Sequence, residues 1–292
     1  MRRPLPQAGF SLLELIVVVV LLGILAAGAG MLIARPIEAY DAQQRRQQLV
    51  DQAEMALRQI ASDVRRALPN SLRVSSAGAL TGVEFVNTVD AARYRDQIDD
   101  SIAMAGPDDI LDFAAADTDF NLLGSFTRLG AFSTGQRLVI YNTTPATLYQ
   151  DALLGNNPGI VTPAGAALTL SNSPLYADEQ HINIDLGAGA GFQFAQPSPG
   201  QRLFVVDSPV SYICNTTTRQ LQRHDNYGFN LAQSLTPGGT TATVVTQLFG
   251  CSMSYNAGSA QHGGLLSIQI SIADASGESV TLLHQVQVEN VP

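Results

Sequence analysis

An uninterrupted apolar segment lies close to the N-terminus. From Leu15 to Ala34 no side chain is charged or strongly polar, and as a helix this segment would extend about 30 Å, the thickness of a bilayer's hydrocarbon core. Arg2 and Arg3 precede it, and the positive-inside bias places them in the cytoplasm. The pattern predicts a transmembrane helix, with everything after Arg35 outside the inner membrane. A cleaved secretory signal is the alternative, because it has the same basic start and apolar centre.

A helical pattern of a different kind follows the apolar segment. Apolar residues recur there every three or four positions, which is the period of one helix face. They are Leu49, Ala53, Leu57, Ile60, Val64 and Leu68. Pro69 and Asn70 should end the helix, and Pro36 should kink it just outside the membrane. Residues 35–69 are therefore predicted to form an amphipathic stalk helix, whose apolar face packs on the rest of the chain.

Beyond the stalk the pattern changes to the two-residue period of half-buried strands. Apolar and polar residues alternate over 251–255, 266–272 and 280–288, which predicts antiparallel strands, and Asp274–Gly277 reads as a hairpin turn. Shorter candidate strands lie at 137–141, 202–206, 209–214 and 243–249, and long loops are expected at 142–174 and 187–200. The predicted fold class is α+β, with a long N-terminal transmembrane and stalk α-helix packed on an antiparallel β-rich globular head, residues 70–292.

Charge is divided unevenly among these segments. The 292 residues carry 16 cations, all arginine, and 25 acids, for a net charge of −9. The first nine residues carry +2, whereas residues 74–292 hold seven arginines against 19 acids. An acidic chain argues against nucleic acid as a partner. Phosphate-binding loops, nucleophile elbows and zinc-binding helix motifs are absent from the sequence, so no enzymatic activity is expected.

Glu14 is the one charge at the start of the apolar segment. A carboxylate costs about 2.5–3.5 kcal/mol at a bilayer centre and less near an interface. An ordinary signal peptide has no use for it, so Glu14 is a candidate functional residue whose partner has to be found.

The residues around Glu14 carry a resemblance. Gly9-Phe10-Ser11-Leu12-Leu13-Glu14-Leu15, between a short basic leader and the apolar segment, resembles the class III signal of type IV prepilins and type II secretion pseudopilins. The resemblance implies that a prepilin peptidase and N-methyltransferase removes the leader, residues 1–9, by cutting after Gly9 and methylates the new N-terminus at Phe10. Residues 10–34 would then remain as the membrane anchor and later as the filament core.

The same resemblance gives Glu14 a role in assembly. Cleavage creates a cationic amine on Phe10, and Glu14 of one subunit can pair with the amine of a neighbour. Two buried charges that pair offset much of the desolvation cost that each would bear alone. Such a pair would set the axial register between subunits, as a buried polar group does in a coiled coil.

Segments beyond the leader resemble the MshO family of mannose-sensitive haemagglutinin (MSHA) pilus biogenesis. They are residues 67–74, 83–85, 92–95, 209–214, 250–251 and 283–292. The resemblance implies a minor pilin, similar in plan to J-type pseudopilins, that helps to initiate or cap a pilus. Its partners would be other minor and major pilins and the inner-membrane assembly platform. The chain would cross the inner membrane once, with a cytoplasmic N-terminus and a periplasmic head, and then enter the pilus near its tip. A minor pseudopilin of a type II secretion system and a tip-located adhesive subunit are the alternatives.

Cys214 and Cys251 are the two cysteines of the chain. In an oxidising compartment an even pair favours a disulfide, which we predict here, with two buried thiols as the alternative.

Nine aspartates fall within residues 90–119. Clustered carboxylates can hold Ca²⁺, although the spacing matches no EF-hand loop, and a solvated acidic loop is the alternative. The candidate calcium ligands are Asp99, Asp100, Asp108, Asp109 and Asp112. We expect no other metal or cofactor.

Overall fold

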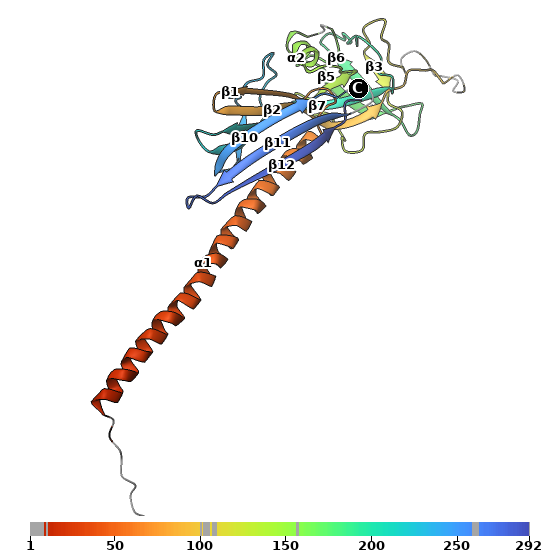
Figure 1. Ribbon diagram of the computed structural model, residues 1–292. Helices are drawn as coiled ribbons and strands as arrows, with labels where there is room; N and C mark the ends of the chain where they lie inside the picture. The colour runs from red at the N-terminus through yellow and green to blue at the C-terminus, as the bar shows by residue number, and fades with distance from the viewer. Residues whose placement is uncertain are drawn as a thin grey trace, which may run out of the picture.

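The computed structural model consists of one long helix and a head of antiparallel strands at one end of it (Figure 1). It describes residues 9, 11–99, 101, 106, 110–155, 158–258 and 263–291, with the backbone alone for residues 30–38. The N-terminal part of helix α1 (Leu12–Val64) projects away from the head, and its C-terminal part lies against it. The predicted α+β class, an apolar N-terminal helix and an antiparallel β-rich head, is confirmed.

Helix α1 extends past Pro36 as a single element and ends at Val64, five residues before the predicted end of the stalk at 69. The backbone leaves the helix there to pair with a strand of the head: the Leu68 amide donates to the Val86 carbonyl, 2.8 Å away, and the Thr88 amide donates to the Arg66 carbonyl at 2.9 Å. Leu68 is nevertheless buried, so its place in the apolar period reflects core packing and not helix.

The described residues of the head form three antiparallel sheets. The main sheet has the order β1 (Arg73–Ala77), β2 (Leu80–Arg93), β7 (Arg202–Asn215), β8 (Gln220–Asp225), β9 (Thr240–Val245). Strand β4 (Arg137–Ile140) also pairs with β7, beyond the end of β8. A second sheet has the order β10 (Leu248–Asn256), β11 (Gly264–Ala273), β12 (Ser279–Val288), and a third has the order β3 (Asp119–Asn121), β6 (Gln180–Asp185), β5 (Ala167–Asn172).

The strands with the clearest alternation form as predicted. The runs at 251–255, 266–272 and 280–288 lie in β10, β11 and β12. The turn between β11 and β12 is closed by Asp274, whose carboxylate accepts hydrogen bonds from the Ser276 and Glu278 amides at 2.9 and 3.0 Å. The candidate strand at 243–249 is divided between β9 and β10.

Other predictions for the head were right only in part. The segments 202–206 and 209–214 are strand as predicted, but they belong to one continuous strand, β7. The expected loop at 142–174 contains helix α2 (Pro145–Leu154) and strand β5. Strand β2 was not predicted at all. Its residues 82–86 are all buried, because α1 packs on one face and α2 lies beyond the other. A strand covered on both faces has no alternation to reveal it.

The main core lies between α1, the main sheet and the β10–β12 sheet. Leu57, Ile60 and Val64 of α1 share this core with Tyr212 of β7 and Ile268 of β11. The apolar stripe of the stalk therefore packs on the head of its own chain. Burying such side chains contributes about 1.5–3 kcal/mol each, so the helix and the head fold as one unit.

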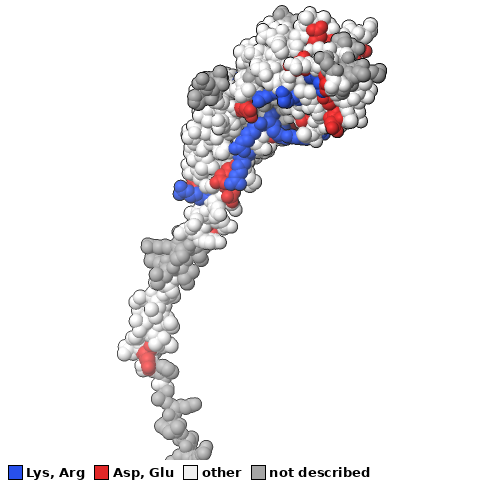
Figure 2. All heavy atoms as spheres, turned by 90° about the vertical axis from the view of Figure 1, so that its right-hand side faces the viewer, with Lys and Arg blue, Asp and Glu red and all other residues white. Residues whose placement is uncertain are grey.

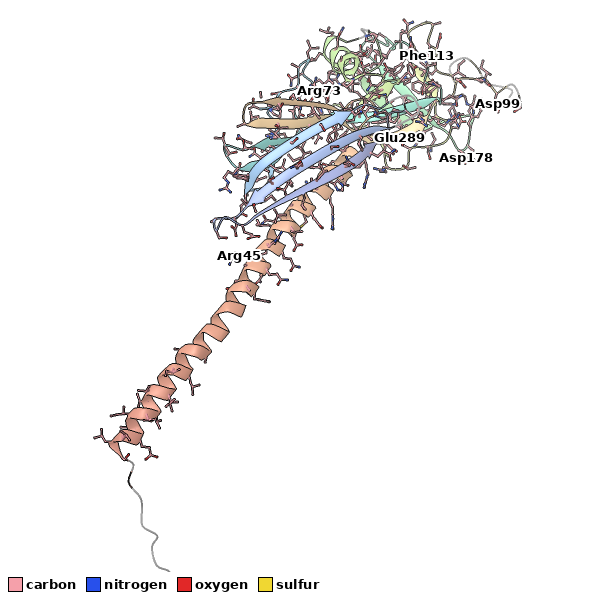
Figure 3. The ribbon with its side chains drawn as sticks, viewed as in Figure 1. Arg45, Arg73, Asp99, Phe113, Asp178 and Glu289 are labelled. Carbon is pink, nitrogen blue, oxygen red and sulfur yellow. A yellow bond between two sulfur atoms is a disulfide. The ribbon has the colours of Figure 1, made fainter. Side chains whose placement is uncertain are left out.

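The described residues between 94 and 201 form an insertion lobe between two paired strands. β2 and β7 pair from Leu80↔Asn215 to Arg93↔Arg202, so the lobe emerges where both strands end. It has its own aromatic core, in which Phe120 and Phe192 are fully buried. The lobe extends beyond the C-terminal end of α1, and Asp99 and Asp178 lie at its far side (Figures 1 and 3).

Candidate functional site

The N-terminal start of α1 holds the residues that the sequence marked for processing and assembly. Ser11 caps the helix: its side-chain oxygen accepts a hydrogen bond from the Glu14 amide at 3.2 Å. This is half of a capping box, and the acid in the first turn also suits the helix dipole. Gly9 is exposed, whereas Phe10 lies outside the described residues. The chain therefore enters the helix just after the predicted cleavage site.

Glu14 points to an interaction that the single chain does not supply. Its side chain is exposed, and its carboxylate forms no ion pair or side-chain hydrogen bond with any described residue. The residues around it are apolar and equally exposed. A carboxylate in that setting needs a cationic partner once the helix is surrounded by lipid or by other helices.

The apolar part of α1 is covered by no other part of the chain that the structure describes. Residues Leu12–Ala29 have a mean hydropathy of 2.8, and none of them is buried. The first contacts with the head are made by Arg45 and Arg46, and Leu49 is the first described apolar residue of the helix that is buried. Residues 12–44 therefore project for about 50 Å. The first part of that length matches a bilayer core, and the same surface can pack against neighbouring helices.

A cluster around Asp63 attaches the last turn of α1 to the head. The Tyr212 hydroxyl of β7 and the Arg223 Nε of β8 donate to Asp63 Oδ2 at 2.7 and 2.9 Å. Arg66 donates to Asp63 Oδ1 at 2.6 Å. Burial raises the pKa of Asp63, but these hydrogen bonds outweigh it and hold the pKa below its usual value. Sequence reasoning missed this cluster, although an acid beside the apolar stripe was a signal for it.

The hairpin between β11 and β12 contacts the stalk closer to the membrane segment. Arg45 Nε lies 3.7 Å from Asp274 Oδ2, and Arg46 Nε lies 3.9 Å from Glu278 Oε1. Arg45 is labelled at this junction in Figure 3. Both arginines are exposed, and an ion pair open to solvent contributes about 0–1 kcal/mol. The two pairs therefore orient the hairpin and add little to stability.

The predicted disulfide between Cys214 and Cys251 is present, with the Cα atoms 6.2 Å apart. Cys214 is the penultimate residue of β7 in the main sheet, and Cys251 lies in β10. The bond therefore ties together the two sheets that enclose α1.

The predicted calcium ligands are only partly described. Asp100, Asp108 and Asp109 lie outside the described residues. Asp99 accepts hydrogen bonds from the amide and hydroxyl of Ser101, and Asp112 accepts one from the Ala114 amide at 2.7 Å. Among the described residues no group of three or more His, Cys, Asp or Glu is placed to hold a metal ion. Calcium binding stays a prediction.

The comparison with known proteins bears on the N-terminus. Residues 5–30 match the prokaryotic N-terminal methylation motif, a match that includes Gly9, Phe10, Glu14 and most of the apolar segment. No curated protein and no solved structure matches the chain. The motif supports a protein similar to type IV pilins and pseudopilins, and it implies processing by a prepilin peptidase and anchoring in the membrane through α1.

Proposed function

We propose that this pilin-like chain is a minor pilin of a type IV pilus of the MSHA type, that its role is structural, and that it helps to initiate or cap pilus assembly. One observation carries the proposal. The methylation motif at residues 5–30 leads into a helix whose first half is bare and apolar, while its second half is locked into a large head.

The mechanism follows from the two halves of α1. The bare half anchors the precursor in the inner membrane, with the head in the periplasm. Cleavage after Gly9 leaves the amine of Phe10 at the end of this half. When helices pack side by side, that amine can pair with Glu14 of a neighbour. Neither charge is then left alone in an apolar surrounding. Because the pair forms at only one relative position of the two helices, it sets the axial register between neighbouring subunits.

The insertion lobe supports a place at the end of the filament. It extends past the C-terminal end of α1 (Figure 1). In a filament of parallel helices we expect it to obstruct a subunit stacked on that end. A subunit that blocks addition on one side can occupy only an end of the filament. That position is the one required for initiation or capping, and it implies few copies per pilus.

A minor pseudopilin of a type II secretion system remains the second candidate, because the helix would work in the same way. Deleting the gene and measuring both pilus number and protein secretion separates the two. We expect pili to be lost and secretion to be unchanged. Normal pili with impaired secretion would instead identify a pseudopilin, and loss of surface adhesion with normal pili would identify an adhesive tip subunit.

A single substitution tests the assembly mechanism. In the deletion strain, Glu14→Leu should restore a stable, membrane-inserted chain but not pili, because the Phe10 amine of the neighbour then has no partner. Asp51→Leu is the matched control, since Asp51 is an exposed acid of the same helix, and it should restore pili fully. Normal piliation with Glu14→Leu would refute the role of the carboxylate.

A further inference from the structure

A groove lined by arginines lies where the end of α1 meets the head and the insertion lobe. It encloses about 480 Å³. Its arginines come from four separate parts of the chain: the end of α1, the end of β2, the insertion lobe and the start of β7. They are Arg65, Arg66, Arg93, Arg128 and Arg202. Figure 2 shows basic side chains gathered in one band from the upper stalk into the head.

The charge of the groove is opposite to that of the head. Its lining contains two acids, Asp90 and Glu289. The Asp90 carboxylate accepts hydrogen bonds from the amides of Arg128 and Leu129, at 2.6 and 2.9 Å, and it forms no ion pair with an arginine among the described residues. The lining therefore carries five arginines against two acids and is positive on balance. About a third of the chain's arginines therefore concentrate on one surface of a protein whose net charge is −9.

Two of the guanidinium groups are free to take a ligand. Arg66 is paired with Asp63, Arg202 donates to the Val291 carbonyl at 3.0 Å, and Arg93 donates to Gln201. Arg65 and Arg128 are exposed, and their guanidinium groups have no partner among the described residues. Between the arginines lies an apolar floor, formed by Val64, Val89, Ala92, Phe204, Val288 and Val291.

We infer that this groove binds a short carboxylate-rich segment of a neighbouring filament subunit. Guanidinium forks bind carboxylates with two parallel hydrogen bonds, and the apolar floor accepts the side chains between them. The groove adjoins the end of α1, where neighbours approach in an assembly held by packed helices. The identity of the partner as a filament subunit rests on the proposed function, whereas the chemistry of the groove does not.

A nucleic acid fits the groove less well. A long polyanion would lie against the acidic remainder of the head, which repels it. Single strands also need aromatic side chains on which bases stack, and the one aromatic in the described lining, Phe204, is half-buried. A short acidic peptide meets neither obstacle.

Binding of defined probes to the full-length mature chain in neutral detergent tests the chemistry. Fluorescence anisotropy at physiological salt would compare three labelled probes: hexaglutamate, hexaglutamine and a single-stranded oligothymidylate with six phosphates. We expect hexaglutamate to bind best and hexaglutamine not to bind. Arg65→Ala combined with Arg128→Ala should weaken hexaglutamate binding by about two- to fivefold per arginine, the worth of an exposed charge pair.

The matched control removes the same charge elsewhere. Arg46→Ala combined with Arg219→Ala replaces two exposed arginines outside the groove and should leave binding unchanged. Circular dichroism melts would verify that both double variants fold. Equal weakening in the two double variants, preference for the oligothymidylate, or no binding of hexaglutamate would each overturn the inference.

A second measurement identifies the partner. Arg65→Glu combined with Arg128→Glu should lower the amount of the chain in sheared pili, while cleavage and membrane insertion stay normal. Wild-type incorporation of this variant would overturn the groove as an assembly surface and leave the proposed function intact. A wild-type chain that binds hexaglutamate but never enters pili would refute the proposed function and the subunit as partner, and would leave the chemistry of the groove standing.

Discussion

Replacing Asp63 by asparagine should loosen the attachment of α1 to the head. Asparagine keeps the size of the side chain but removes the charge that Arg223 and Arg66 face. A hydrogen bond to a charged group contributes about 1.5–3 kcal/mol when shielded from water. The bonds from Tyr212 and Arg223 are shielded, whereas the Arg66 side chain is 51% exposed and its pair contributes less.

The expected loss of unfolding free energy is therefore about 2–3 kcal/mol. For a protein of this size each kcal/mol corresponds to about 2–4 °C in Tm, so Tm should fall by about 4–12 °C. Thermal unfolding of the full-length chain in detergent, followed by circular dichroism, measures the change. Asp51→Asn is the control, because Asp51 is an exposed acid of the same helix, and it should leave Tm unaltered.

The effect of Asp63→Asn should depend on pH in a defined direction. The pKa of Asp63 is lowered in the folded protein, so its stabilising contribution is complete above the unfolded-state pKa of about 4 and is lost as the pH falls through the lower folded-state value. The Tm difference between wild type and variant should be constant from about pH 7 to pH 5 and shrink below about pH 4. Equal Tm values for Asp63→Asn and Asp51→Asn at neutral pH, or a difference that grows in acid, would refute this account of the cluster.

Three further predictions concern the disulfide, the cleavage site and a buried ion pair. Cys214→Ser should lower stability by about 4 kcal/mol, the chain-entropy value for its 37-residue separation, and a wild-type Tm indifferent to reductant would contradict this. Gly9→Val should leave an uncleaved precursor in immunoblots without disturbing the fold, because a Cβ at Gly9 meets nothing within 4 Å; normal maturation would count against the cleavage site. Arg73→Ala should destabilise the head by about 3–5 kcal/mol, because it leaves Glu84, which is 1% exposed, without its cation. Adding Glu84→Gln should recover part of the lost Tm, and no recovery would exclude the buried charge as the cause.

The strands that the sequence revealed are those with one face in the core and one in water. In β11 every second residue is buried, and in β12 Val280, Val286 and Val288 are, so the alternation is visible in the chain itself. In β2 and the C-terminal half of β7 both faces are buried, and the period disappears. Helix α2 carried a readable start signal, since Thr144 caps it and Pro145 is its first residue, but its brevity hid it within an expected loop.

The insertion lobe and the arginine groove had no local signal in the sequence. The lobe is defined by the pairing of β2 with β7, which brings the two ends of the intervening segment together. Arg66 follows the end of α1, and Arg202 lies where β7 begins its pairing with β2. Both line the same groove, although they are 136 positions apart in the sequence.

The sequence by itself determined the N-terminal part of this protein: the motif around Gly9 and Glu14, the apolar helix, the amphipathic stalk and the α+β class. These features are local, because a peptidase reads a short segment, and helices and half-exposed strands have short periods. The tertiary structure decided the partners of Asp63, the lobe and the groove. Each of them joins residues that come close only after strands distant in the sequence pair. Such contacts leave no periodic pattern in the sequence.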